Sequence, residues 1–294
     1  MRIVGIRRPD GAGVEVADLS ARGDEVTVIA PLAEFWADPA GCLARPASGR
    51  VLGVGAVELV PPVLPDARVL CVGLNYLDHA AEGSYRDQEL PPYPSLFGRW
   101  TRSLTVDGAE VPVPSNEDGL DWEGEVVAWV GAPLVDASPE EALAAVLGYS
   151  AFNDLTSRRA QKLTSQWTLG KNGDRSGPLG PIVPAAEVGD LRDGLRVTTR
   201  VNGETMQDAR TDQMIYPVGN TLSLISHTMT LRPGDLLATG TPSGVGYVRR
   251  PPRLLGPGDV VEVEVERLGS VRNTVVGNDH RGQSVNISSA ACTL

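Results

Sequence analysis

Residues 121–131 read DWEGEVVAWVG, in which Glu123 and Glu125 stand two positions apart at the start of an apolar run. Side chains alternate across a β-strand, so in a strand both glutamates share one face with Val127 and Trp129. That face is acidic at one end and apolar at the other. A carboxylate that faces a core is costly unless it is paired, protonated or bound to a cation. The segment therefore predicts a strand whose two glutamates hold a partner.

Asp154 is a third candidate carboxylate, because it ends an apolar approach in GYSAFNDLTSRRAQ, residues 148–161. Three carboxylates provide the all-oxygen ligand set that hard cations such as Mg²⁺ and Mn²⁺ prefer. Glutamate pairs of this spacing also occur on solvated strands, where they bind nothing. The residue pattern alone leaves a metal site and a solvated acidic face both open.

The composition excludes several classes of protein. The chain has 294 residues, 41% of them hydrophobic and 21% charged, which is typical of a globular domain with a substantial core. No apolar run has the length of a membrane helix, and the N-terminal residues do not resemble a secretion signal, so we expect a cytoplasmic protein. Three cysteines without CxxC spacing argue against a zinc cluster. The net charge of −11 disfavours nucleic-acid binding and indicates a small-molecule partner.

The distribution of glycine and proline predicts the organisation of the chain. The 33 Gly and 23 Pro are spread throughout, as in proteins with many short strands joined by turns, so we expect an α+β fold that is mainly β. Three prolines between residues 58 and 67 indicate a linker. We therefore divide the chain into a small N-terminal domain at 1–60, a main domain at 68–280 and a C-terminal tail at 281–294.

Local signals predict individual elements. Asn202-Gly203 between two apolar stretches indicates a hairpin, since both positions tolerate positive φ. Strict alternation of valine and glutamate predicts a strand over 261–266 with one solvated face. Ser138 is a candidate N-cap for a helix over 139–147, and further helices are expected over 221–228 and, as a short turn, within 75–83.

Three more features suggest chemistry. His79 precedes Glu82 by three residues, so on a helical turn the carboxylate can orient the imidazole as a general base; the alternative is a surface helix. Lys171 stands in a glycine-rich loop, either close to a substrate oxygen or simply solvated. The turn TGTPSGVG, residues 239–246, offers backbone N–H groups and threonine hydroxyls to a carboxylate.

Taken together, these segments resemble the fumarylacetoacetate hydrolase family. Eight blocks occur in the family's order across about residues 70–275: VGLNYLDHAAE, PSLFGR, DWEGEVVAWVG, GYSAFNDLTSRRAQ, GKNGDRSGPLGP, VNGETMQDART, LRPGDLLATGTPSGVG and LGPGDVVEVEVERLG. The resemblance extends to the branch of bacterial acylpyruvate hydrolases and 2-hydroxyhepta-2,4-diene-1,7-dioate isomerases. It implies mixed β-sheets rolled around a divalent metal, Mg²⁺ or Mn²⁺, and a homodimer.

The resemblance also implies roles for individual residues. By motif position, Glu123, Glu125 and Asp154 match the metal ligands, His79 with Glu82 matches the water-activating dyad, and Lys171 matches the lysine near the reacting oxygen. The residues assigned to substrate binding are Gln161, Thr241 and Arg99. Arg99 departs from the family pattern, because many members have lysine at this position.

The expected activity is metal-dependent hydrolysis of the carbon–carbon bond of a 1,3-diketo acid such as an acylpyruvate. A 2-oxo acid substrate chelates the metal, which stabilises the enolate that forms when the bond breaks. The same electrophile serves an isomerase or a decarboxylase of related acids, including oxaloacetate, but a base that makes a nucleophile favours hydrolysis. A binding protein without catalysis is a more remote alternative. The polar segment at 82–94 is expected to form a lid, with Arg86 as a contact for a distal carboxylate.

Overall fold

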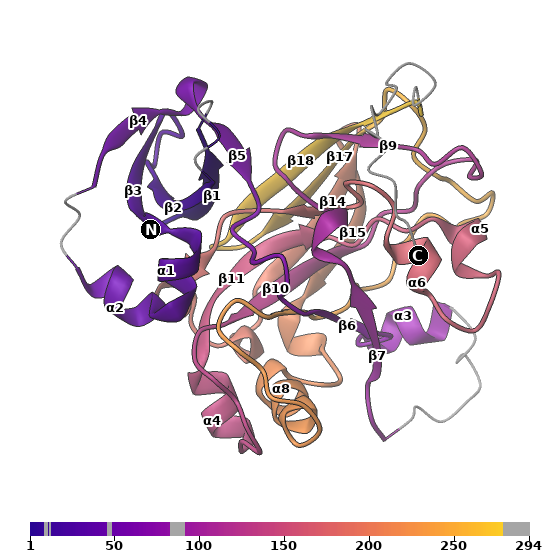
Figure 1. Cartoon of the computed structure of the whole chain (residues 1–294). Coiled ribbons are helices and arrows are strands. Elements are labelled where there is room, and N and C mark those ends of the chain that lie inside the picture. Colours follow the sequence, from indigo (N-terminus) through magenta and orange to yellow (C-terminus); the bar gives the residue numbers. More distant parts are fainter. Residues whose placement is uncertain (9–10, 12, 46–48, 83–91, 279–294) are drawn as a thin grey trace, which may run out of the picture.

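The computed structural model describes residues 1–8, 11, 13–45, 49–82 and 92–278 (Figure 1). The expected C-terminal tail at 281–294 lies outside these residues, as does most of the expected lid, including Arg86. In the described part, three β-sheets carry short helices, so the prediction of a mainly β fold is confirmed. No helix in these residues is long and apolar enough to cross a membrane.

The N-terminal residues form a five-stranded antiparallel sheet, drawn in indigo in Figure 1. Its strands, in spatial order, are β4 (Val51–Gly53), β3 (Glu25–Pro31), β2 (Val14–Leu19), β1 (Ile3–Arg7) and β5 (Glu58–Val60). Two short helices, α1 (Leu32–Ala37) and α2 (Pro39–Ala44), follow β3, and a 3₁₀ turn spans Val54–Ala56. The linker predicted to begin at residue 58 begins later, because β5 pairs with β1 through Val60 opposite Gly5.

The central sheet has eight strands and carries the candidate site. Its order is β7 (Ser95–Arg99), β6 (Val69–Gly73), β16 (Leu236–Ala238), β10 (Gly124–Val130), β11 (Val146–Asn153), β12 (Gly177–Leu179) and β8 (Leu104–Val106), while β13 (Val183–Pro184) also pairs with β11. The pairs β6–β16 and β8–β12 are parallel and the others antiparallel, so the sheet is mixed.

A third sheet packs against the central one. Its order is β15 (Glu204–Arg210), β14 (Arg196–Val201), β17 (Val260–Val265), β18 (Gly269–Val276) and β9 (Glu110–Pro112). The predicted hairpin joins β14 to β15, with φ of 52° at Asn202 and 85° at Gly203. The alternating valine–glutamate strand is β17, whose valines at 261, 263 and 265 are buried.

The helices are short and lie at the edges of the sheets. Ser138 caps α4 (Pro139–Ala144) with a full capping box, and α4 ends before 147 because Val146 already begins β11. The longest helix in the described part of the chain, α8 (Val218–Ser226), packs on α4. Three others, α3 (Leu77–Glu82), α5 (Arg158–Gln161) and α6 (Thr168–Lys171), lie near one another on the right of Figure 1. The remaining pieces are α7 (Ala185–Val188) and 3₁₀ turns at Thr101–Ser103, Leu191–Asp193 and Thr211–Gln213.

Strand β10 is buried on both faces, and its two faces serve different layers. Val127 and Trp129 belong to the cluster that includes the N-terminal helices, where the Trp36 ring stacks on Trp129 at 5.7 Å between centroids. Val126 and Ala128 belong to the cluster that includes the third sheet. Glu125 lies on the same face as Val127 and Trp129 by strand alternation, so the acidic end of an otherwise apolar face is held inside the protein.

Candidate metal centre

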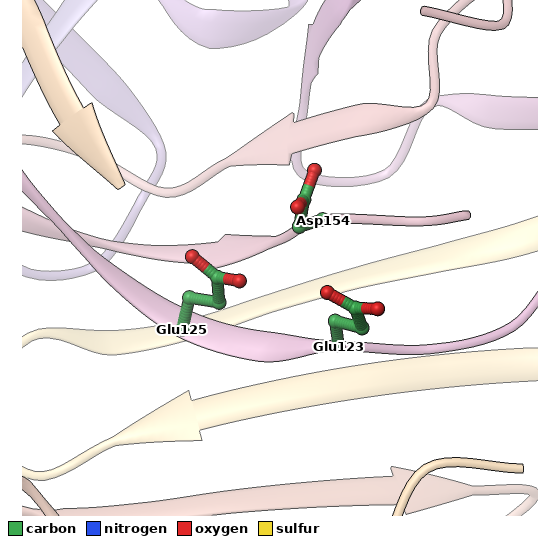
Figure 2. Close-up of side chains that lie close together, drawn as sticks. All are labelled: Glu123, Glu125 and Asp154. Carbon is green, nitrogen blue, oxygen red and sulfur yellow. The ribbon is translucent and has the colours of Figure 1, made fainter. Parts of the chain in front are cut away.

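The strand pair β10–β11 brings the three carboxylates together. Glu123 directly precedes β10, Glu125 is its second residue, and Asp154 directly follows β11. The antiparallel register sets Gly124 opposite Asn153, and the Asp154 N–H donates to the Glu123 carbonyl at 2.9 Å. One carboxylate oxygen from each of the three residues lies within 4.8 Å of the other two (Figure 2).

Gly124 stands between the two glutamates because another sheet packs onto its backbone. A Cβ at this position would lie well under 3.0 Å from Thr199 Oγ1 of β14 and 3.3 Å from Gln207 Oε1 of β15. The Gln207 oxygen accepts from the Gly124 N–H at 2.9 Å and from the Thr199 hydroxyl at 2.7 Å. The Gln207 amide nitrogen donates to Thr241 Oγ1 at 2.8 Å. Gln207 therefore links the backbone between the glutamates to the glycine-rich turn.

Two cations, Lys171 and Arg158, pair with Glu123, and Lys171 also pairs with Asp154. Lys171 Nζ donates to Glu123 Oε2 at 2.7 Å and to Asp154 Oδ2 at 2.6 Å. Arg158 Nη2 lies 2.7 Å from both Glu123 Oε1 and Asp121 Oδ2. Burial by itself raises the pKa of Glu123, but the charges of Lys171 and Arg158 outweigh it and lower that pKa to about 2.

Glu125 has a different environment. It accepts a hydrogen bond from the Gly240 N–H at 2.9 Å, and no cation in the described residues forms an ion pair with it. Burial, together with the negative charges of Asp154 and Glu123, raises the pKa of Glu125 well above its usual range. A buried carboxylate without a cationic partner is costly, and a bound cation removes that cost.

This donor set fits a hard divalent cation. All three donors are carboxylates, they are 6% exposed or less, and their oxygens are close enough to share one ion. The ion pairs also agree: among the described residues, four carboxylates, from Asp121, Glu123, Glu125 and Asp154, face three cations, Lys171, Arg158 and Arg99. Glu125 is the carboxylate that is left without a cationic partner.

His79 of the predicted dyad lines a small pocket next to this site. His79 lines a cavity of about 100 Å³ together with Glu123, Lys171, Gln161 and Thr241. Its Nδ1 lies 3.4 Å from Glu82 Oε2, which is long for a hydrogen bond. The Gly244 N–H donates to both oxygens of Glu82, at 3.0 and 3.1 Å. The glycine-rich turn thus fixes the carboxylate that orients His79.

Gln161 and Thr241, both assigned to substrate contact, line the pocket, and each already forms hydrogen bonds within the protein. Gln161 Oε1 accepts from Arg158 Nη1 at 3.0 Å, so its amide nitrogen is the end available to a ligand. The Thr241 hydroxyl accepts from Gln207 and donates to the Gly124 carbonyl at 3.0 Å. Its proton reaches a substrate only if that second bond opens.

Arg99 occupies a different place from the one expected. Its side chain is fully buried behind Asp154, to which its Nε donates a short hydrogen bond. The other four N–H groups donate to Ser103 Oγ, Ser176 Oγ, the Leu155 carbonyl and the Ser176 carbonyl. With all five donors used inside the protein, Arg99 holds Asp154 and the surrounding chain rather than a substrate.

Two residues that complete the site were not predicted from the sequence. Asp121 and Arg158 stand inside quoted motifs, from which only Glu123, Glu125, Asp154 and Gln161 were assigned to the site. Asp121 accepts from Arg158 and also from the backbone N–H groups of Gly246 and Tyr247, at 2.6 and 3.1 Å. The available signal for this ion pair was an acidic residue in one ligand motif and a basic residue in the other.

Comparison with known proteins identifies the family and the fold. Residues 68–276 match the family model described as fumarylacetoacetate (FAA) hydrolase C-terminal. A 2,4-didehydro-3-deoxy-L-rhamnonate hydrolase from a Sphingomonas species is 37% identical over 284 residues, which cover 96% of this chain and 94% of that protein. The crystal structure of 2-hydroxyhepta-2,4-diene-1,7-dioate isomerase from Mycobacterium marinum superposes with a TM-score of 0.75 at 32% identity, covering 95% and 99% of the two chains. Fumarylpyruvate hydrolase from Pseudomonas aeruginosa, solved with Mn²⁺ and pyruvate, gives 0.65 at 33% identity, covering 74% and 91%.

Proposed function

The chain belongs to the fumarylacetoacetate hydrolase family and is an enzyme, and from that premise we propose that it hydrolyses the carbon–carbon bond of a 1,3-diketo acid of the acylpyruvate or fumarylpyruvate type. The observation that carries the proposal is the position of His79, which lies beside Glu82 and lines the same small pocket as Glu123. Hydrolysis needs a base that makes water nucleophilic, whereas decarboxylation does not.

The carboxylates of Glu123, Glu125 and Asp154 hold Mg²⁺ or Mn²⁺ in this proposal. The bound ion supplies a Lewis acid that polarises the 2-oxo acid and stabilises enolate charge. The protein prepares this site with fixed charges: Lys171 and Arg158 orient Glu123, while Arg99 and Lys171 orient Asp154. Such outer partners keep ligand oxygens in place for binding.

His79 removes a proton from water, and the water oxygen bonds to the distal carbonyl carbon of the diketo acid. Glu82 stabilises the imidazolium that results, and the Gly244 N–H keeps Glu82 in position. The bond between that carbon and the neighbouring methylene then breaks. Its electron pair stays with the pyruvate part as an enolate, which takes up a proton, and the acyl part leaves as a carboxylic acid.

Within the described residues, Lys171 has one side-chain N–H without a hydrogen-bond partner. Its ammonium carries three protons, of which Glu123 and Asp154 take two. Burial lowers the pKa of Lys171, but the charges of Asp154 and Glu123 more than compensate and raise it above the ordinary value, so the group stays cationic. The third proton is available to the oxygen on which negative charge develops.

The similarity to the Sphingomonas protein supports hydrolysis. Its name describes a hydrolase of an acid with didehydro positions 2 and 4 on either side of a deoxy carbon, the same oxidation pattern as a 1,3-diketo acid. The similarity to the Mycobacterium marinum isomerase supports a second candidate, since His79 also serves to relocate a proton without water attack. A decarboxylase of oxaloacetate would use the same enolate and leave His79 unused.

Product analysis separates these reactions. Acetylpyruvate is incubated with the Mn²⁺-loaded protein, and products are followed by proton NMR. The proposed hydrolase releases acetate and pyruvate in equal amounts, and His79→Ala lowers that rate by about 10²–10⁴-fold. Keto–enol exchange without acetate, or carbon dioxide release from oxaloacetate that is unaffected by His79→Ala, would replace the proposal by the isomerase or the decarboxylase.

A further inference from the structure

The pocket that Glu123 lines is small and is lined by both polar and apolar side chains. Its volume is about 100 Å³, well below the roughly 300–1,000 Å³ of sites for drug-sized ligands. Its polar residues include Glu123, Lys171, Arg158 and Gln161. Its apolar residues, called the apolar side below, are Val72, Leu74, Phe97 and Trp167. A ligand in this space is short, and part of it contacts hydrocarbon.

Trp167 is the largest side chain of the apolar side, and its position depends on Gly73. A Cβ at Gly73 would lie 2.8 Å from Trp167 Cη2 and closer still to Cζ3, so only glycine lets the indole lie on the end of β6. The ring also meets Phe97 edge-on, with centroids 5.4 Å apart and an interplanar angle of 70°. Trp167 is therefore packed on two sides.

The backbone beneath Trp167 is fixed. Leu74, directly after Gly73, has φ of 60°, a conformation that leucine rarely adopts. Asn75 holds the segment in place: its Nδ2 donates to the carbonyls of Thr239 and Tyr216, at 2.7 and 3.1 Å, and its Oδ1 accepts from the Tyr216 N–H at 2.7 Å. Trp167 forms one wall of the pocket. This wall is supported by a strained backbone segment, which the surrounding hydrogen bonds hold in place.

Trp167 and Lys171 share one structural unit. The Lys171 N–H donates to the Trp167 carbonyl at 3.1 Å, which places the two residues one helical turn apart at the ends of α6. Lys171 is anchored to two carboxylates, so the position of the indole is tied to the reacting end of the pocket. With its 2-oxo acid end at the carboxylates, a substrate has the rest of the pocket lining, Trp167 included, to accommodate its acyl end.

We infer that Trp167 sets the upper length of the acyl group, and that the enzyme selects 2-oxo acids with short acyl chains. The inference rests on the proposed function, since it takes the 2-oxo acid end to bind at Glu123, Glu125 and Asp154. It adds a specificity residue and a substrate class. Replacing Trp167 by alanine removes the wall and opens the pocket to longer chains, while the carboxylates and His79 stay in place.

The test is a binding series, because binding does not require turnover. Pyruvate, 2-oxobutanoate and 2-oxooctanoate are titrated calorimetrically into the Mn²⁺-loaded full chain, as wild type and as Trp167→Ala. Trp100→Ala is the matched control, since Trp100 is 61% exposed and does not line the pocket. We expect wild type to bind 2-oxooctanoate at least about tenfold more weakly than 2-oxobutanoate, because a single misfit methylene already changes discrimination by that factor.

In Trp167→Ala we expect the penalty for 2-oxooctanoate to disappear, with pyruvate affinity close to wild type and the Trp100→Ala profile unchanged. Equal affinities for short and long acids in wild type, or a penalty that survives in Trp167→Ala, would overturn the inference. The proposed function fails separately. If Trp167→Ala relieves the chain-length limit but the protein does not cleave acetylpyruvate, the role of Trp167 stands and the hydrolase activity is wrong. Cleavage of acetylpyruvate and hexanoylpyruvate at equal rates by wild type retains the hydrolase and rejects the wall.

Discussion

Gly124→Ala should damage the metal centre without touching a ligand. The new methyl group would lie well under 3.0 Å from Thr199 Oγ1, within a buried network that includes Gln207. Overpacking in a core costs about 1–3 kcal/mol, and loss of the Thr199–Gln207 or Gly124–Gln207 hydrogen bond adds about 1 kcal/mol. We therefore expect unfolding free energy to fall by about 2–4 kcal/mol in total.

The same substitution displaces the backbone between Glu123 and Glu125, so Mn²⁺ affinity should fall by about 10–100-fold, as for other outer-shell changes. Urea denaturation of the metal-free protein and calorimetric Mn²⁺ titration measure the two effects. Thr199 provides matched partners: in the Gly124→Ala background, Thr199→Ala removes the atom that clashes, whereas Thr199→Val leaves a carbon there. We expect a favourable coupling energy of about 0.5–3 kcal/mol with Thr199→Ala only. Equal effects of the two Thr199 changes would refute the packing explanation for Gly124.

Three further outcomes follow from the charges of the site. Lys171→Met leaves Glu123 and Asp154 without their shared cation, so the free energy of unfolding of the metal-free protein, measured by thermal unfolding, should fall by about 3–5 kcal/mol. Mn²⁺ at a hundred times its Kd should restore about 2.7 kcal/mol. A stability equal to wild type would show that the ion pairs are not needed. His79→Gln should lower kcat by about 10²–10⁴-fold with unchanged Mn²⁺ affinity by calorimetry, and a parallel loss of affinity would remove His79 from the role of base. Because the pKa of Glu125 is raised, the metal-free site carries a proton below that pKa, so Mn²⁺ affinity should increase as pH rises through it; titration heats that do not vary between buffers of different ionisation enthalpy would contradict this proton release.

Local sequence signals predicted the elements whose causes are local. The Asn202-Gly203 hairpin, the β17 strand and the capped start of α4 follow from turn chemistry, alternation and an N-cap, and the structure contains all three. Strand β10 was also predicted, with Glu125, Val127 and Trp129 on one face. Element ends were less accurate: β5 continues into the expected linker, because pairing with β1 depends on residues far away in the sequence.

Residue spacing alone could not predict the cluster of three carboxylates. Two glutamates on one strand fit a solvated face equally well until β11 brings Asp154 beside them, a contact that the resemblance supplied and the pattern did not. The residues that support the site could not be predicted from the sequence for the same reason. Gln207 stands 83 residues from Gly124, and Arg99 stands 55 residues from Asp154. Such pairings arise from how sheets pack, so neither the support by Gln207 nor the buried position of Arg99 could be inferred from composition or periodicity.

The most direct measurement is restoration of acylpyruvate cleavage by metal. Chelator-treated protein is mixed with acetylpyruvate, loss of ultraviolet absorbance is recorded, and Mn²⁺ or Mg²⁺ is then added back, with Glu125→Ala as the matched protein. The proposed function predicts no turnover without metal, turnover with pyruvate release after addition, and none in Glu125→Ala. Cleavage by the metal-free protein, or equal rates in wild type and Glu125→Ala, would contradict a reaction that depends on the carboxylate site.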